Sequence, residues 1–196
     1  KREEITLVAV TKKFSPQVML EAYACGLRVF GENYVQEFER KRPELAAMTD
    51  AQFHFIGHLQ SNKTRPVALH FDWVHGVDRE PIARRLSDQR GHFVPPLNIC
   101  LQVNVLGEAS KGGVTPAELP ALIDAVRDLP RLRLRGLMGW EGHVAGMEPG
   151  EQKRAATIAA VNLLTSSADA CRAAGIPIAI VSAGGTGTHP VTAGLP

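Results

Sequence analysis

Apolar residues along this chain gather in short runs that alternate with amphipathic stretches. Seven runs are rich in β-branched or aromatic side chains, and this predicts buried strands at residues 5–12, 27–31, 53–57, 71–77, 97–105, 132–140 and 178–182. The stretches between them predict six helices, which begin near Ser15, Glu32, Ser61, Asp78, Thr115 and Gly150.

Local signals mark several helix ends. Ser15 followed by Pro16 is typical of an N-cap and a first helical residue, and Gly26 can end that helix. Asp78 is a candidate N-cap for the helix that ends near Gly91. The motif Thr115-Pro116-Ala117-Glu118 has the form of a capping box.

Regular alternation of strands and helices predicts an α/β fold with parallel strands and right-handed crossovers. A doubly wound sheet is one arrangement of this kind. Polar residues suited to chemistry follow the strands at their carboxyl ends, which favours a (β/α)8 barrel with one shared site. Because a closed barrel of this type needs eight strands and the pattern supplies seven, we expect an incomplete barrel that lacks its last strand, as one domain over residues 1–196.

Composition narrows the function classes. With 44% hydrophobic and 21% charged residues the chain has the composition of a globular domain, and a net charge of +2 gives no reason to expect nucleic acid or a membrane surface as a partner. No apolar run reaches the ~20 residues of a membrane span. Cys25, Cys100 and Cys171 are far apart and lie in apolar contexts, which favours reduced thiols in a cytoplasmic protein.

Lys12 is the first candidate for chemistry. It follows the apolar run that opens the chain, at the carboxyl end of the first predicted strand. A partly desolvated lysine there loses some preference for the ammonium form, and the free amine is the nucleophile that forms a Schiff base. A lysine whose charge simply reaches solvent is the alternative.

The run from Ser182 to Thr188 is the second candidate. Its hydroxyl side chains, which include Ser182 and Thr186, lie beside Gly184 and Gly185 in the sequence. Backbone amides in such a turn can bind a phosphate dianion. An ordinary flexible loop explains the turn alone equally well. A lysine on the first strand together with a phosphate cradle on the seventh fits pyridoxal 5′-phosphate (PLP), which needs an amine for its aldehyde and donors for its phosphate.

The seven histidines show no metal-binding spacing, and we expect no metal. His54, His70, His75 and His92 are interpreted as packing or surface residues. His58, His143 and His189 follow strands and could line the site.

Several motifs resemble the pyridoxal phosphate homeostasis protein family over residues 5–138. They are Ala9-Val10-Thr11-Lys12, residues 30–37 (FGENYVQE), residues 54–63 (HFIGHLQSNK), Phe71-Asp72-Trp73, Asn104, Ser110-Lys111 with Gly113, and residues 132–138 (LRLRGLM). The resemblance implies a barrel like the alanine racemase N-terminal domain. It also implies that Lys12 carries the Schiff base, with Asn33 beside the cofactor, and that the protein buffers PLP rather than turning over a substrate.

Residues 139–196 differ from that family. Glu141, His143 and the turn at residues 182–188 look like the D-threonine aldolase and D-serine dehydratase branch of the same fold type, in which a Gly-Gly-Thr turn binds the cofactor phosphate. The arginine that would face the pyridine nitrogen on a last barrel strand is absent from this chain, which argues against efficient carbanion chemistry.

Three functions follow as hypotheses. The first is a cytoplasmic PLP-homeostasis protein that holds PLP on Lys12 through Asn33, Ser182, Gly184, Gly185 and Thr186 and passes it to PLP-dependent client enzymes. The second is a PLP-dependent D-amino-acid lyase or racemase. The third is a chain that holds no cofactor, because seven strands leave two open sheet edges.

Overall fold

The computed structural model describes residues 4–105 and 112–195. The predicted Ser110 and Lys111 motif residues lie outside the described ranges. The strands are β1 (Ala9–Val10), β2 (Val29–Glu32), β3 (Gln52–Phe55), β4 (Trp73–Val77), β5 (Leu97–Gln102), β6 (Leu132–Met138) and β7 (Ile180–Ser182). The α-helices are α1 (Pro16–Ala24), α2 (Val35–Lys41), α3 (Thr64–His70), α4 (Glu80–Gln89), α5 (Leu119–Val126), α6 (Glu151–Ala173) and α7 (His189–Thr192). Short 3₁₀ helices are η2 (Arg42–Leu45), η3 (Ser61–Lys63) and η4 (Gly142–Gly146).

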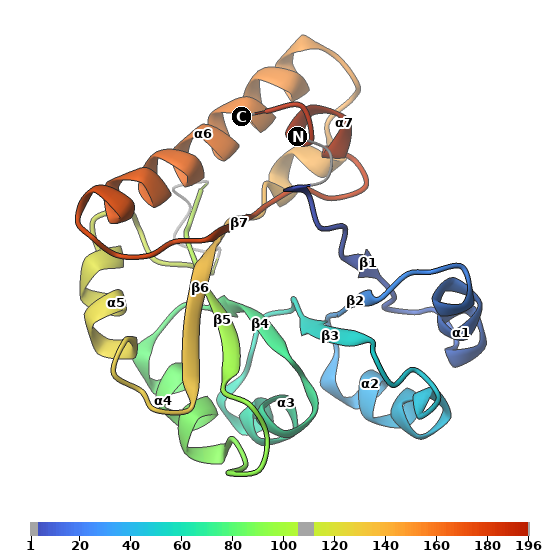
Figure 1. The fold of residues 1–196 in the computed structure, drawn as a ribbon. Helices are drawn as coiled ribbons and strands as arrows, with labels where there is room; N and C mark the ends of the chain where they lie inside the picture. The colour runs from blue at the N-terminus through green and yellow to red at the C-terminus, as the bar shows by residue number, and fades with distance from the viewer. Residues whose placement is uncertain (1–3, 106–111, 196) are drawn as a thin grey trace.

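All seven strands form one parallel sheet in the order β1-β2-β3-β4-β5-β6-β7. The sheet curls, and the helices α1 to α6 lie around its outer side (Figure 1). The predicted architecture of parallel strands alternating with helices in an incomplete barrel is therefore confirmed, with β1 and β7 at the two edges of the sheet.

The first strand is much shorter than predicted. The sequence pattern predicts a strand over residues 5–12, whereas only Ala9 and Val10 pair with β2. As an edge strand, β1 is paired on one side only, and the side chains of Ile5 and Leu7 remain 55% and 71% exposed. The apolar run therefore does not identify a strand buried on both faces.

Helix ends follow the local chemistry in most places. The Ser15 hydroxyl accepts a hydrogen bond from the Val18 amide at 3.4 Å, as expected for the N-cap of α1. The prediction for Asp78 is wrong. Arg79 occupies the N-cap position of α4 without a side-chain cap, because Asp78 forms an ion pair with Arg79 and a proline lies in the first turn of the helix.

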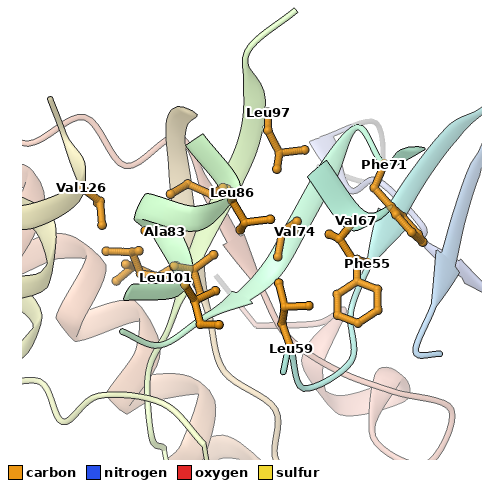
Figure 2. Close-up of a cluster of buried hydrophobic side chains, with 14 of the residues drawn as sticks. Phe55, Leu59, Val67, Phe71, Val74, Ala83, Leu86, Leu97, Leu101 and Val126 are labelled. Carbon is orange, nitrogen blue, oxygen red and sulfur yellow. The ribbon is translucent and has the colours of Figure 1, made fainter. Parts of the chain in front are cut away.

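The hydrophobic core lies between the outer side of the sheet and the helices (Figure 2). Phe55, Val74 and Leu97 from the strands pack against residues of α3 and α4, among them Val67 and Leu86. Each of these five side chains is at most 1% exposed. Since this core occupies the helix side of the sheet, the other face of the sheet is available for polar side chains.

Candidate functional site

Strand register identifies the inner face of the curled sheet. Phe30 and Phe53 are register partners, and Phe53 contacts Phe38 of α2, so this pair faces the helices. Gly31 and His54, one position further along, therefore face inward. Val10 is the register partner of Gly31, which places the last residue of β1 on the inner face.

Lys12 follows β1 two residues after Val10, at the carboxyl end of the sheet. Its side chain is partly buried. Within the described residues its ammonium group takes part in no hydrogen bond or ion pair. No other group of the described residues therefore holds the Lys12 side-chain nitrogen.

Asn33 follows β2 at the same edge of the sheet. Its side-chain oxygen Oδ1 is buried and has no hydrogen-bond partner among the described residues. The backbone of Asn33 lies so close to Gly57 that a Cβ at position 57 would come within 2.2 Å of the Asn33 carbonyl oxygen. Gly57 therefore allows the loops after β2 and β3 to meet. The buried Asn33 Oδ1 is an unsatisfied acceptor that a ligand can use.

A chain of three side chains crosses the inner face. His54 Nδ1 lies 2.9 Å from His75 Nε2, and His75 Nδ1 lies 2.9 Å from Ser182 Oγ. Burial lowers the pKa of His75 to about 4, and burial together with the neighbouring His75 lowers the pKa of His54 to about 3. Both rings are therefore neutral at pH 7, and in each ring one nitrogen carries the hydrogen and donates while the other accepts.

This network was not expected. From sequence both histidines are interpreted as packing or surface residues, and the structure buries them, with 5% and 4% of their surface exposed. Their ring nitrogens, however, connect β3 and β4 to the predicted cofactor residue Ser182. His54 also stacks on Trp73, with ring centroids 5.2 Å apart. The sequence signal that could have indicated the network is the position of His54 and His75 late in neighbouring strands.

The predicted phosphate turn is wrapped around a buried carboxylate. Gly184 donates its amide hydrogen to Glu141 Oε2 at 3.3 Å, and Thr188 Oγ1 donates to Glu141 Oε1 at 2.5 Å. The Gly185 amide donates to Thr188 Oγ1 at 3.0 Å. Glu141 is 1% exposed. Gly184 has a φ of +87°, which favours glycine, and a Cβ there would lie 2.8 Å from Thr192 Oγ1.

The structure thus brings some predicted residues together and separates others. Ser182, Gly184 and Gly185 lie in one turn with Glu141 and Thr188, while the Thr186 side chain is exposed. The loop histidines are exposed as well: His58, His143 and His189. Lys12 and the turn follow β1 and β7, at the two edges of the sheet.

The residues near Lys12 fit the aldehyde and the ring of PLP. The turn at Gly184 fits the phosphate group of PLP under one condition. A free Lys12 amine and the unsatisfied Asn33 oxygen suit the aldehyde and the polar ring substituents. The Gly184 amide already binds a carboxylate, which shows that this turn accepts an anionic oxygen. A phosphate dianion can take that place only when the Glu141 carboxylate moves away, since two anions repel at this distance.

Among residues 4–105 and 112–195, no group of three or more histidine, cysteine or acidic side chains is placed to hold a metal ion. No helix in the described part of the chain is long and apolar enough to cross a membrane.

Comparisons with known proteins agree with this architecture. A pyridoxal phosphate homeostasis protein of Pseudomonas aeruginosa is 60% identical over 134 residues, which are 68% of this chain and 58% of that protein. The chain therefore spans less than two thirds of the length of that relative. PipY of Synechococcus elongatus, solved with PLP bound, is 32% identical, with a TM-score of 0.71 over 91% of this chain and 80% of PipY.

D-threonine aldolase from Filomicrobium marinum shares the fold with a TM-score of 0.79 over 96% of this chain and 51% of the aldolase, at 19% identity. That identity supports a common fold and nothing finer. The family model of the alanine racemase N-terminal domain matches residues 3–190. This chain belongs to the alanine racemase N-terminal domain family.

Proposed function

We propose that this chain binds PLP and serves in the intracellular homeostasis of that cofactor, as one PLP-binding barrel domain over residues 1–196. The carrying observation is the Lys12 amine, which is partly buried at the carboxyl end of the sheet and free of protein partners among the described residues. The relatives support the proposal, because one is named a pyridoxal phosphate homeostasis protein and PipY was solved with PLP bound.

In this proposal Lys12 would hold PLP covalently, because its Nζ would supply the amine with which the aldehyde of the cofactor reacts. Asn33 Oδ1 accepts a hydrogen bond from the ligand, which would satisfy an acceptor that is otherwise buried and unpaired.

The phosphate binds at the other end of the ligand. Ser182, Gly184, Gly185 and Thr186 donate hydrogen bonds to it, and the Glu141 carboxylate gives up the Gly184 amide. The cofactor supplies the electrophilic aldehyde and the electron-withdrawing ring. The protein supplies the amine and the hydrogen-bond donors.

We further propose that the protein acts in the cytoplasm and releases PLP to PLP-dependent client enzymes. The cysteines support a reducing compartment, since Cys25, Cys100 and Cys171 are all free thiols. Nucleic acid and membranes are not proposed as partners, because the net charge of +2 provides little attraction for either.

Borohydride reduction followed by peptide mapping tests the proposal. The folded parent chain is saturated with PLP, reduced and digested, and we expect the added pyridoxyl mass on the peptide that contains Lys12. Lys63, which also lies at this end of the sheet, serves as the internal comparison. An unmodified Lys12 in a folded, PLP-saturated sample would rule the proposal out.

A D-amino-acid lyase or racemase is the second candidate, and it finds less support. Both oxygen atoms of Glu141 are engaged by Gly184 and Thr188, and His143 is exposed. An acid–base pair would need at least one of these groups free beside the substrate. Incubation of the PLP-loaded chain with D-threonine or D-serine and a divalent metal, against a Lys12→Ala control, decides between the two functions.

A further inference from the structure

Lys12 lies within a tight turn that carries backbone strain. The turn runs from Thr11 to Phe14 and is closed by a hydrogen bond from the Phe14 amide to the Thr11 carbonyl at 3.1 Å. Lys13, the third residue of the turn, has a φ of +66° and is the non-glycine residue with positive φ in the described chain. A left-handed conformation is unfavourable for a residue with a side chain such as lysine, so surrounding contacts must maintain it.

A buried ammonium group holds one side of this turn. Lys41, whose side chain is 7% exposed, donates from Nζ to the Thr11 carbonyl at 2.9 Å. The same nitrogen contacts Glu32 Oε1 at 2.9 Å and Glu37 Oε1 at 2.6 Å. The three hydrogens of the ammonium group are thereby all used.

A carboxylate holds the other side. Glu37 Oε1 accepts a hydrogen bond from the Lys13 amide at 2.5 Å. Desolvation raises the pKa of Glu37, but hydrogen bonds from Lys41 and from the Lys13 amide outweigh it and leave the pKa below its ordinary value. The carboxylate therefore remains charged at pH 7 and keeps both partners.

Glu32 completes the network from β2. Its side chain is fully buried, and its Oε1 accepts hydrogen bonds from Lys41 and from the Thr11 hydroxyl at 2.9 Å each. Buried ion pairs are weak evidence of stability by themselves, because desolvation offsets much of their attraction. This one is connected to the backbone immediately before and immediately after Lys12, and a pair serving stability alone needs neither connection.

We propose that Lys41, Glu37 and Glu32 are positioning residues that fix the strained turn and thereby hold the Lys12 amine in place for its ligand. The inference rests on the proposed function of Lys12, and it assigns a role to residues that themselves do not contact the ligand. The side chain of Lys12 is long and rotatable, so its amine is placed accurately only if its backbone is fixed at both ends.

The first test uses no ligand. Replacement of Glu37 by alanine removes the acceptor of the Lys13 amide, so we expect hydrogen exchange of that amide to accelerate at least ~10-fold. Amides of β2 should keep their protection. Glu39→Ala, on the exposed side of the same helix, is the matched control and should leave the Lys13 amide unchanged.

The second test separates positioning from binding. We compare the rate of Lys12 modification by PLP with the affinity for 4-deoxypyridoxine 5′-phosphate, which has the phosphate and ring but no aldehyde. Glu37→Ala should slow the modification ~10- to 100-fold, as expected for a displacement of about 1 Å, and change the affinity for the analogue less than ~2-fold. Glu37→Gln keeps a carbonyl oxygen for the Lys13 amide and should recover most of the rate.

Equal rates in the parent and Glu37→Ala would overturn the inference, as would a parallel loss of rate and analogue affinity. Lys41→Met offers the same comparison from the other side of the turn. Lys41→Met leaves two buried carboxylates without a cation, so the fold of this variant must first be verified. If Lys41→Met unfolds, the comparison with Glu37→Gln provides the test. A parent chain unmodified at Lys12 would instead contradict the proposed function. The hydrogen-exchange experiment would still test whether Glu37 fixes the turn at Lys13, because it uses no ligand.

Discussion

His75 Nδ1 lies 2.9 Å from Ser182 Oγ, although the two residues are 107 positions apart in the sequence. His75 belongs to β4 and Ser182 to β7, with β5 and β6 between them in the sheet. A flat sheet would hold these side chains far apart, since neighbouring strands are about 4.8 Å apart. The contact is therefore a consequence of the curl of the sheet, which turns its inner face into a shared polar site (Figure 1).

The two buried histidines predict a pH dependence of stability. Folded-state pKa values of about 3 for His54 and about 4 for His75 lie below the ~6.5 of an unfolded histidine, so the unfolded state binds more protons as the pH falls below 6.5. The contribution of these two histidines to the free energy of unfolding should be constant above pH 7 and should fall between pH 6.5 and 4, by up to ~1.4 kcal/mol per pH unit for each histidine.

Urea titrations of the parent and of His75→Gln measure this dependence. Burial raises the pKa of Asp72, which acts in the opposite direction, so the informative quantity is the difference between the two proteins. We expect the variant to lose about half of the histidine contribution to the slope. Identical slopes in both proteins would show that His75 is not held neutral by burial.

Ser182→Ala is expected to weaken phosphate binding selectively. A hydroxyl that donates to a phosphate contributes about 1.5–3 kcal/mol, so the affinity for PLP should fall at least ~10-fold. The affinity for pyridoxal, which lacks the phosphate, should change less than ~2-fold. Ser166→Ala on the exposed side of α6 is the control. Equal losses for the two ligands would place Ser182 away from the phosphate.

Glu141→Gln is expected to strengthen phosphate binding. The glutamine keeps one oxygen that can accept from the Gly184 amide, and its NH2 group can donate to the Thr188 hydroxyl oxygen in place of the bond that Thr188 now donates. It loses the charge that competes with the phosphate. Removal of a like charge at this distance should tighten binding of PLP or inorganic phosphate about 10-fold. Calorimetry of both ligands checks the result, and weaker binding by the variant would mean that the phosphate does not bind at this turn.

Leu86→Ala tests the core that supports the site. Leu86 is fully buried among residues of α4 and the strands (Figure 2), so its truncation should lower the free energy of unfolding by about 2–5 kcal/mol. Leu69, which is 44% exposed on α3, is the matched control, and its replacement by alanine should cost less than ~1 kcal/mol. Similar losses in both variants would contradict the packing of the core.

Local chemistry made much of the fold predictable. The Ser15 N-cap and the long helix α6 follow from residue types over a few positions, and both are present. The extent of β1 was not predictable, because the run from Ile5 to Lys12 has strand composition while pairing depends on a neighbour on each side. Composition does not report that a strand lies at an edge.

The candidate site was also predictable only in part, because residue patterns are visible in the sequence and contacts between distant segments are not. Lys12 and the glycine turn stand out as residue types in a pattern. The contact of His75 with Ser182 joins residues 107 positions apart and depends on the curvature of the sheet. The contact of Glu141 with Gly184 joins residues 43 positions apart, in the loops that follow the neighbouring strands β6 and β7. The hydrogen bond from Lys41 to the Thr11 carbonyl joins residues 30 positions apart, and Lys41 is buried although a charged residue in a helix is more often exposed.

The most direct test of the central claim is an absorption spectrum recorded after addition of PLP, compared between the parent chain and Lys12→Ala. The proposal predicts a Schiff-base absorption band in the parent, with no such band in the folded variant. A band of equal intensity in both proteins, or no band in a folded parent saturated with PLP, would contradict the assignment of Lys12 as the residue that holds the cofactor.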